Sequence, residues 1–137
     1  MLDVFNQKNL SIMSAEGRMS TPLPGAGTFA FRPRVSANGQ IVYGSDRSGT
    51  LQIWKMDLDG NNAAQVTKNS DIFFTEMDAS SDGKWVVYGR SIGGYSELWK
   101  VPIQGGEPVR LTHQPSYSGR VSISPDAKTV AYTYRDS

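Results

Sequence analysis

The chain has 137 residues, of which 38% are apolar and 20% charged, and its formal net charge is +1. This composition is typical of one folded domain, and the sequence lacks the basic tracts with which many proteins bind nucleic acid. The absence of a run of about 18 apolar residues predicts no membrane helix, and residues 1–5 lack the basic and apolar regions of a secretory signal, so the compartment stays open. Because the sequence holds no cysteine and a single histidine, disulfides, thiolate metal sites and cysteine nucleophiles are excluded.

The first 30 residues predict the outer part of an incomplete repeat. Leu10 to Gly17 resembles Ile53 to Gly60 further along the chain, which predicts a strand followed by a turn. The segment from Pro22 to Gly27 is rich in proline and glycine and predicts a loop. A dinucleotide-binding loop at residues 25–30 would need a following helix, and Pro33 excludes one.

The sequence repeats itself with a period of 44 residues. Ser36, Ser80 and Ser124 each open a short turn that leads into an apolar run ending on tyrosine. One residue inserted near Trp85 changes the offset to 45, and seven of the 25 positions from residue 43 to residue 67 are then identical. Chance would give about one or two identities at average composition. The chain is therefore built from internal repeats.

Each repeat predicts short strands separated by turns. Asn38-Gly39 and Asp82-Gly83 predict tight hairpin turns because both residue types tolerate positive φ, whereas Pro125 and Ala127 suit a type I turn. No stretch has the apolar period of a long helix. The expected strands are a first one at Val35–Ser36 and Val121–Ile123, a second one ending at Tyr43, Tyr88 and Tyr132, a third one at Leu51–Leu58 and Glu97–Ile103, and a fourth one at Ala64–Thr67 and Val109–Thr112.

Four antiparallel strands every 44 residues predict the blades of a β-propeller, an all-β fold. An immunoglobulin-like sandwich has similar strand spacing but does not repeat its own sequence. Trp54, Trp85 and Trp99 recur at blade spacing and are expected to pack between blades. We predict a partial propeller of roughly three blades, with outer strands of an incomplete blade and a loop at residues 1–30, blades at 31–76 and 77–118, and inner strands of a further incomplete blade at 119–137.

The repeat resembles that of TolB-type WD-like propellers. The stretch 105–112 followed by 124–136 is similar to propellers attached to bacterial serine/threonine kinases and winged-helix regulators. Asn38 and Ala127 depart from the family pattern and affect turns only. The resemblance implies a module of a bacterial TolB-like or sensor-type protein, and the matching segments are Ser124-Pro125-Asp126-Ala127-Lys128, Ser45-Asp46-Arg47, Leu98-Trp99-Lys100 and Leu111-Thr112.

No catalytic constellation is apparent. His113 is the one histidine that could act as a base, and it lies in a predicted loop. Gly94-Tyr95-Ser96 lacks the closing glycine of a nucleophile elbow, so we expect no enzymatic activity. The segment from Asp57 to Asn61 resembles part of a calcium loop without its further oxygen ligands. We interpret it as a hairpin turn and expect no cofactor, with calcium as the alternative.

The connections at one end of the predicted blades are long, namely Asp46–Thr50, Lys68–Thr75, Ser91–Ser96 and His113–Gly119. Long loops on a rigid scaffold commonly carry function. This loop end is the candidate interaction face, and its residues are Arg47, Asp71, Phe73, Phe74, Tyr95, His113 and Tyr117.

Two functions follow as hypotheses. The first is a non-catalytic module that binds a protein or peptide, and the second is the accessory propeller of a prolyl-oligopeptidase-like serine hydrolase. Nucleic acid and membrane insertion are not expected. Because about three blades cannot close a ring, a homodimer that closes a six-bladed ring is one way to satisfy both open ends.

Overall fold

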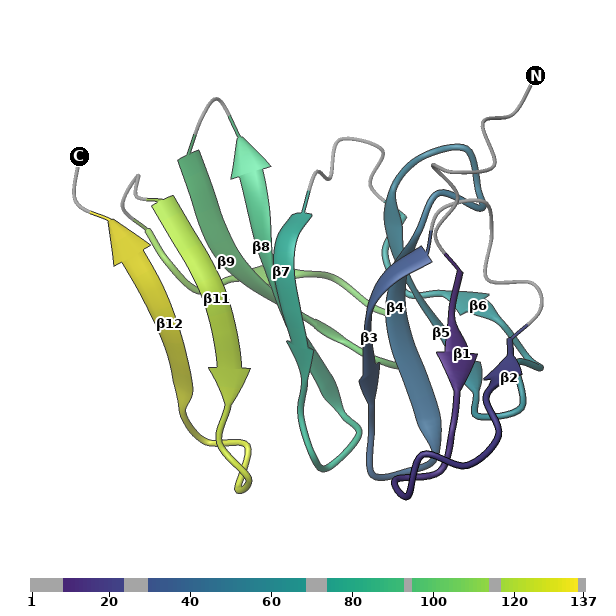
Figure 1. Cartoon of the computed structure of the whole chain (residues 1–137). Coiled ribbons are helices and arrows are strands. Elements are labelled where there is room, and N and C mark those ends of the chain that lie inside the picture. The colour runs from purple at the N-terminus through teal and green to yellow at the C-terminus, as the bar shows by residue number, and fades with distance from the viewer. Residues whose placement is uncertain (1–8, 24–29, 69–73, 93–94, 114–116, 136–137) are drawn as a thin grey trace.

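The computed structural model describes residues 9–23, 30–68, 74–92, 95–113 and 117–135, and all regular elements in these ranges are β-strands. The strands form four antiparallel sheets that stand side by side, with the first and last sheets at opposite ends of the row (Figure 1). Within the described ranges, no helix has the length and apolarity needed to cross a membrane. The prediction of an all-β, partial propeller is confirmed.

Two of the sheets are complete four-stranded blades in meander order. Their central strands share one register, because Tyr43 lies opposite Trp54 in the first blade and Tyr88 lies opposite Trp99 in the second. The sequence repeat is therefore a structural repeat. The first blade consists of β3 (Ala30–Val35), β4 (Gln40–Ser45), β5 (Gln52–Asp57) and β6 (Ala64–Gln65), and the second of β7 (Phe74–Ala79), β8 (Trp85–Ile92), β9 (Tyr95–Pro102) and β10 (Val109–Arg110).

The two terminal sheets have two strands each. The N-terminal sheet pairs β1 (Ser11–Ile12) with β2 (Thr21–Pro22), and the C-terminal sheet pairs β11 (Tyr117–Ile123) with β12 (Val130–Arg135). The loop predicted from Pro22 is wrong at its start, because Pro22 pairs with Ser11 and Leu23 is buried. The amide of Leu23 donates to the carbonyl of Leu10 at 2.9 Å, which extends the sheet beyond β2. Residues 24–27 lie outside the described ranges.

Two apolar clusters lie between neighbouring sheets. The sides of β4 are divided between them, since Ile41 and Tyr43 belong to one cluster and Val42 to the other. A strand between two neighbours is buried on both faces, which explains its unbroken apolar sequence. The first cluster joins the N-terminal sheet to the first blade and contains Leu10, Leu23, Ala30, Ile41, Tyr43 and Met56. The second joins the two blades and contains Val42, Ile53, Val66, Met77, Val86, Tyr88, Val101 and Ile103.

A threonine ties the fourth strand to the third in both complete blades. Thr67 Oγ1 accepts a hydrogen bond from the Ile53 amide at 2.9 Å and donates to Gln52 Oε1 at 2.7 Å. Thr112 Oγ1 accepts from the Leu98 amide at 3.0 Å in the second blade. The recurrent threonine therefore satisfies a backbone donor where the two-residue fourth strand has already ended.

The turn between the first and second strands is the same in all three copies. Its fourth residue donates an amide hydrogen bond to the serine carbonyl three residues earlier, as from Gly83 to Ser80 at 3.0 Å. That residue has φ of 77° at Gly39, 73° at Gly83 and 61° at Ala127, whereas Asn38 and Asp82 stay outside the positive-φ region. The prediction of positive φ at Asn38 and Asp82 is therefore wrong, and the first two turns resemble the third one, in which Ala127 takes the place of the two glycines.

Side chains reinforce these turns. Asp82 Oδ1 accepts two hydrogen bonds, one from Ser80 Oγ at 2.5 Å and one from the Lys84 amide at 3.0 Å. The hydrogen bond from the Ser80 hydroxyl is the main reason why the pKa of the Asp82 carboxyl lies below its usual value. Ser124 lowers the pKa of Asp126 in the same way, with a hydroxyl-to-carboxylate distance of 2.6 Å.

The limits of the first and fourth strands differ from the predicted ones in opposite directions. First strands are longer, since β3 and β11 begin five and four residues before the predicted starts. Fourth strands are shorter, because β6 and β10 have two residues each. The long connection predicted between Ser91 and Ser96 is wrong, because these two residues pair with each other across β8 and β9.

Candidate functional site

The predicted loop-end face is only partly described. Asp71 and Phe73 lie outside the described residues. Phe74 and Tyr117 are the first residues of β7 and β11, but their side chains lie outside the described part. Three members remain, and they occupy separate connections: Arg47 follows β4, Tyr95 begins β9 and His113 follows β10.

The three described members have different surroundings. Arg47 is exposed, and its guanidinium carbon lies 5.3 Å from the centre of the Trp54 ring. Tyr95 is 47% exposed, and His113 is exposed as well. The described part of the chain therefore offers an aromatic and two basic side chains at this end, without a nucleophile held against a base.

Each of the three tryptophan rings contacts a cationic side chain of its own blade. The Arg90 guanidinium lies 5.2 Å from the Trp99 ring centre, and Lys100 Nζ lies 4.4 Å from that of Trp85. Trp54 and Trp99 also pack against the first and second apolar clusters respectively. Such cation–π contacts stabilise a ring in place. The predicted packing role is confirmed for Trp54 and Trp99.

A second surface, which the sequence analysis missed, is formed by the first strands of the two complete blades and of the C-terminal sheet. Strands β3, β7 and β11 lie next to one another along one side of the row (Figure 1). Each of them has a register shift that contains a charged residue, namely Arg32, Glu76 and Arg120. Such irregularities in strand pairing re-aim side chains. We call this surface the inner-strand wall and define it by Arg32, Arg34, Glu76, Asp78, Arg120 and Ser122.

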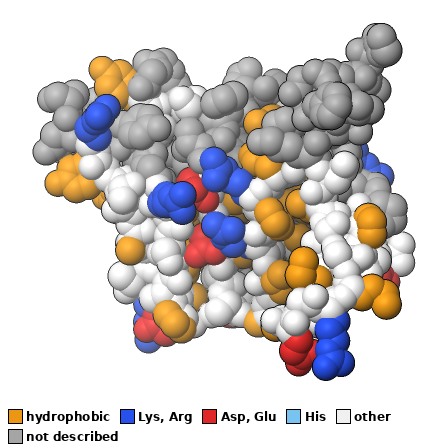
Figure 2. All heavy atoms as spheres, in the orientation of Figure 1, with side chains coloured by type: hydrophobic (Ala, Val, Ile, Leu, Met, Phe, Trp, Pro, Cys, Tyr) orange, Lys and Arg blue, Asp and Glu red, His pale blue; other side chains and the backbone are white. Residues whose placement is uncertain are grey.

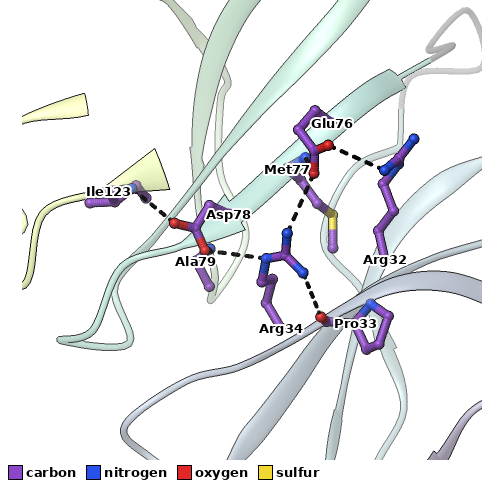
Figure 3. A network of polar contacts seen from close by, with 8 residues as sticks. All are labelled: Arg32, Pro33, Arg34, Glu76, Met77, Asp78, Ala79 and Ile123. Atoms are coloured by element: carbon purple, nitrogen blue, oxygen red, sulfur yellow. Dashed lines mark hydrogen bonds and ion pairs between the residues drawn. The ribbon is translucent and has the colours of Figure 1, made fainter. Parts of the chain in front are cut away.

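Ion pairs connect β3 to β7 on this wall (Figure 3). Arg32 Nη1 lies 3.2 Å from Glu76 Oε2, and Arg34 Nη2 lies 3.5 Å from Glu76 Oε1. Arg34 Nε also lies 3.4 Å from Asp78 Oδ1. The Glu76 side chain is 8% exposed, whereas both arginines are 42% exposed. A nearly buried carboxylate thus lies between two guanidinium groups that reach the surface.

The same network continues to the third strand. Asp78 Oδ2 accepts a hydrogen bond from the Ile123 amide of β11 at 2.8 Å (Figure 3). Asp78 therefore joins Arg34 of the first blade to the backbone of the C-terminal sheet. Within the described residues, Arg120 of β11 forms no ion pair and is exposed.

A pocket of about 540 Å³ opens on the inner-strand wall. Charged side chains of both signs lie in the middle of this face of the molecule (Figure 2). The rim adds hydroxyl groups and a tyrosine ring, so the surface offers donors, acceptors and apolar contact together. The lining residues are Arg34, Glu76, Asp78, Arg120, Val121, Ser122, Ala131, Tyr132 and Thr133.

The signal that locates this wall is present in the sequence. Arg32, Glu76 and Arg120 are 44 residues apart, and so are Arg34, Asp78 and Ser122. The prediction began the first strands only at Val35 and Val121, which left the charged positions outside any strand. Reading the 44-residue period through these positions would have placed them side by side.

Buried tyrosines at the blade centres do not supply an acid or base near neutral pH. Burial raises the pKa of Tyr88 to about 12, and the charge of Arg90 opposes this only in part. Burial likewise raises the pKa of Tyr43, with Arg47 opposing. Both phenols are therefore protonated at neutral pH. Their role in this structure is packing.

The carboxylates of the segment from Asp57 to Asn61 accept hydrogen bonds within their own turn. Asp59 Oδ1 accepts from the Asn61 amide at 2.9 Å, and Asp57 Oδ2 accepts from Asn62 Nδ2 at 2.7 Å. Among the described residues, no three His, Asp or Glu side chains form a group that could hold a metal ion.

Residues 27–137 match the family model of the dipeptidyl peptidase IV (DPP IV) N-terminal region. No curated protein matches the sequence. The match covers all of the inner-strand wall and both complete blades, whereas β1 and β2 precede it.

Solved structures share the fold at low sequence identity. The putative TolB from Agrobacterium tumefaciens has a TM-score of 0.83 and 20% identity, over 96% of this chain and 47% of that one. TolB from Acinetobacter baumannii has a TM-score of 0.73 and 19% identity, over 92% and 32%. The tricorn protease has a TM-score of 0.65 and 16% identity, over 85% and 12%. This chain has a TolB-type β-propeller fold and spans less than half the length of the TolB chains.

Proposed function

The chain belongs to the family of the dipeptidyl peptidase IV (DPP IV) N-terminal region, and from this premise we propose that it is a non-catalytic module whose inner-strand wall binds a protein or peptide segment. The observation that carries the proposal is the pocket of about 540 Å³, which spans strands of three successive sheets. Function resides in sites placed on a fold, so this pocket is a better guide than the fold itself.

The chemistry of the wall suits a polypeptide better than a nucleic acid. Arg32 and Arg34 are paired with Glu76 and Asp78, so the wall has no excess of unpaired cations for a phosphate backbone. Ser122 and Thr133 offer hydroxyl groups to main-chain amides and carbonyls, and Tyr132 offers an aromatic face. Exposed Arg120 is available to a carboxylate of the partner.

The loop end remains a second possible contact surface of the same binding module. Arg47, Tyr95 and His113 are exposed there. Polar replacement of Tyr95 distinguishes the two surfaces, because this residue lies outside the pocket on the wall.

A selected peptide tests the proposal. A random dodecapeptide display library is selected on the 137-residue chain, and the best peptide is titrated calorimetrically against variants. We expect Arg120→Ala to weaken binding at least about tenfold, because one charge-assisted hydrogen bond contributes roughly 1.5–3 kcal/mol. Arg18→Ala, an exposed arginine beside the first turn, is the matched control and should leave the affinity unchanged. A loss with Tyr95→Ser alone would contradict the wall and place the site at the loop end.

A second function is supported by the family match, whose description names a peptidase, and by the likeness to the tricorn protease. We propose as the alternative that the propeller is the accessory domain of a serine hydrolase. The coding sequence downstream of Ser137 tests it. A hydrolase domain with a Gly-x-Ser-x-Gly motif there supports the alternative, and any other continuation contradicts it.

A further inference from the structure

Arg32 lies within β3 in a backbone conformation that few non-glycine residues adopt. Its φ is 51°, and the other non-glycine residues with positive φ in the described ranges lie outside the strands. It also falls in the register shift between Phe31 and Arg34. A strained conformation of this kind persists only where the surrounding structure holds it, and it is frequent at ligand-binding sites. The backbone of Arg32 therefore points to a role beyond strand formation.

The Arg32 side chain reaches from the first blade to the second (Figure 3). Its Nη1 lies 3.2 Å from Glu76 Oε2, and within the described residues the guanidinium has no further hydrogen bond or ion pair. A guanidinium has five N–H groups in a fixed planar arrangement. Arg32 therefore keeps most of its donors for a ligand.

Arg34 has a different role, because its guanidinium is held on three sides. Nη1 donates to the Pro33 carbonyl at 3.0 Å, Nη2 lies 3.5 Å from Glu76 Oε1, and Nε lies 3.4 Å from Asp78 Oδ1 (Figure 3). Glu76 is fixed as well, since its Oε1 accepts a hydrogen bond from the Met77 amide at 3.2 Å. Arg34 and Glu76 thus form a fixed support for the neighbouring guanidinium.

The cationic groups of this network are more accessible than the anionic ones. Both arginine side chains are 42% exposed, whereas those of Glu76 and Asp78 are 8% and 20% exposed. A partner that approaches the wall therefore meets N–H donors first. A carboxylate suits these donors, because its two oxygens accept parallel hydrogen bonds from one guanidinium. Since Glu76 and Asp78 lie directly behind, the site suits a single carboxylate better than a run of negative charges.

We propose that Arg32 binds the side-chain carboxylate of an aspartate or glutamate in the segment that occupies the inner-strand wall. This inference rests on the proposed function and names the chemistry that its partner presents. The junction of β3 and β7 has further sheets on both sides (Figure 1). A segment that lies along the row therefore passes Arg32 with its interior, which favours a side chain over a C-terminal carboxylate.

The dodecapeptide selected on the chain is the probe for this contact. It is synthesised with an amidated C-terminus, and each of its aspartate or glutamate residues is replaced in turn by asparagine or glutamine. In calorimetric titrations of the native chain, one replacement should weaken binding at least about tenfold, because a charge-assisted hydrogen bond is lost. The same replacement should have little effect on binding to Arg32→Gln, since that variant already lacks the partner of the carboxylate.

Two further variants separate this role from folding. Arg32→Lys keeps a positive charge opposite Glu76 but loses the planar arrangement of donors. It should bind the acidic peptide more weakly than the native chain at a similar melting temperature, and it replaces Arg32→Gln if that variant fails to fold. Arg18→Gln, in the exposed connection between β1 and β2, is the matched control and should leave the affinity unchanged.

The outcomes distinguish this inference from the function on which it rests. A peptide that loses affinity for Arg120→Ala, but has no acidic side chain coupled to Arg32, would overturn the inference and leave the proposed function in place. Binding that requires a free C-terminal carboxylate and no acidic side chain would overturn the inference in the same way. Failure to select a peptide, or equal affinity for the native chain and Arg120→Ala, would overturn both.

Discussion

Ala127 is the one residue of the three equivalent turns that adopts positive φ without being glycine. A left-handed conformation costs a non-glycine residue roughly 1–2 kcal/mol, and glycine costs about 0.4–1 kcal/mol more in the unfolded chain. We therefore expect Ala127→Gly to raise the free energy of unfolding by about 0.5–1 kcal/mol in denaturant titrations. Gly39→Ala is the matched control and should lower it, because no atom stands within 4 Å of the new Cβ and only the backbone is strained. An unchanged stability in both variants would contradict this explanation.

Burial of Tyr88 makes the free energy of unfolding depend on pH in the alkaline range. Its pKa is about 12 in the folded chain against 10.0 in the unfolded one, so the folded chain holds the proton more tightly. Its contribution to stability is complete below pH 10 and is lost as the pH rises from about 10 to about 12. We expect Tyr88→Phe, which cannot ionise, to lose less stability than the native chain over this interval. Denaturant titrations between these pH values measure the difference, and identical slopes would contradict the assignment.

At the scale of elements, the ion pairs of the inner-strand wall join strands of different blades. Glu76 is nearly buried between Arg32 and Arg34. We expect Glu76→Gln to lower the free energy of unfolding by roughly 1–3 kcal/mol, because Arg32 loses its carboxylate partner and Arg34 keeps only Asp78. Glu107→Gln, in an exposed turn, should change it by less than about 0.5 kcal/mol. Thermal unfolding of both variants measures this, and equal effects would show that the wall contributes nothing specific.

The sequence predicted elements where local chemistry determines them. The apolar runs ending at Tyr43 and Tyr88, and the glycine turns between strands, are visible without the structure. The starts of β3 and β7 were not predicted, because their charged residues gain partners only when two blades lie side by side. The two-residue strand β2 was missed for a related reason, since its pairing with β1 rather than its composition defines it.

The candidate site was likewise predicted only where local sequence determines it. The loop-end residues were chosen because loops are recognisable from sequence, and the structure describes Arg47, Tyr95 and His113 on separate connections. The inner-strand wall combines residues that are 44 positions apart. Only the stacking of blades brings these residues together, which is why a residue-by-residue reading overlooked them.

At the scale of the whole molecule, the repeat has two consequences. It stacks similar blades, which buries both faces of β4 and β8, and it aligns the first strands into one wall. Within the described residues, the sheet at each end of the row has two strands.

Hydrogen exchange of the 137-residue chain with and without the selected dodecapeptide tests the central claim most directly, because it locates the bound peptide without any substitution. Backbone amides in β3, β7 and β11 should exchange more slowly when the peptide binds, since these strands form the inner-strand wall. Residues 46–50 and 111–113 at the loop end should exchange as before. Slower exchange confined to the loop end, with β3, β7 and β11 unchanged, would contradict the claim that the inner-strand wall is the binding surface.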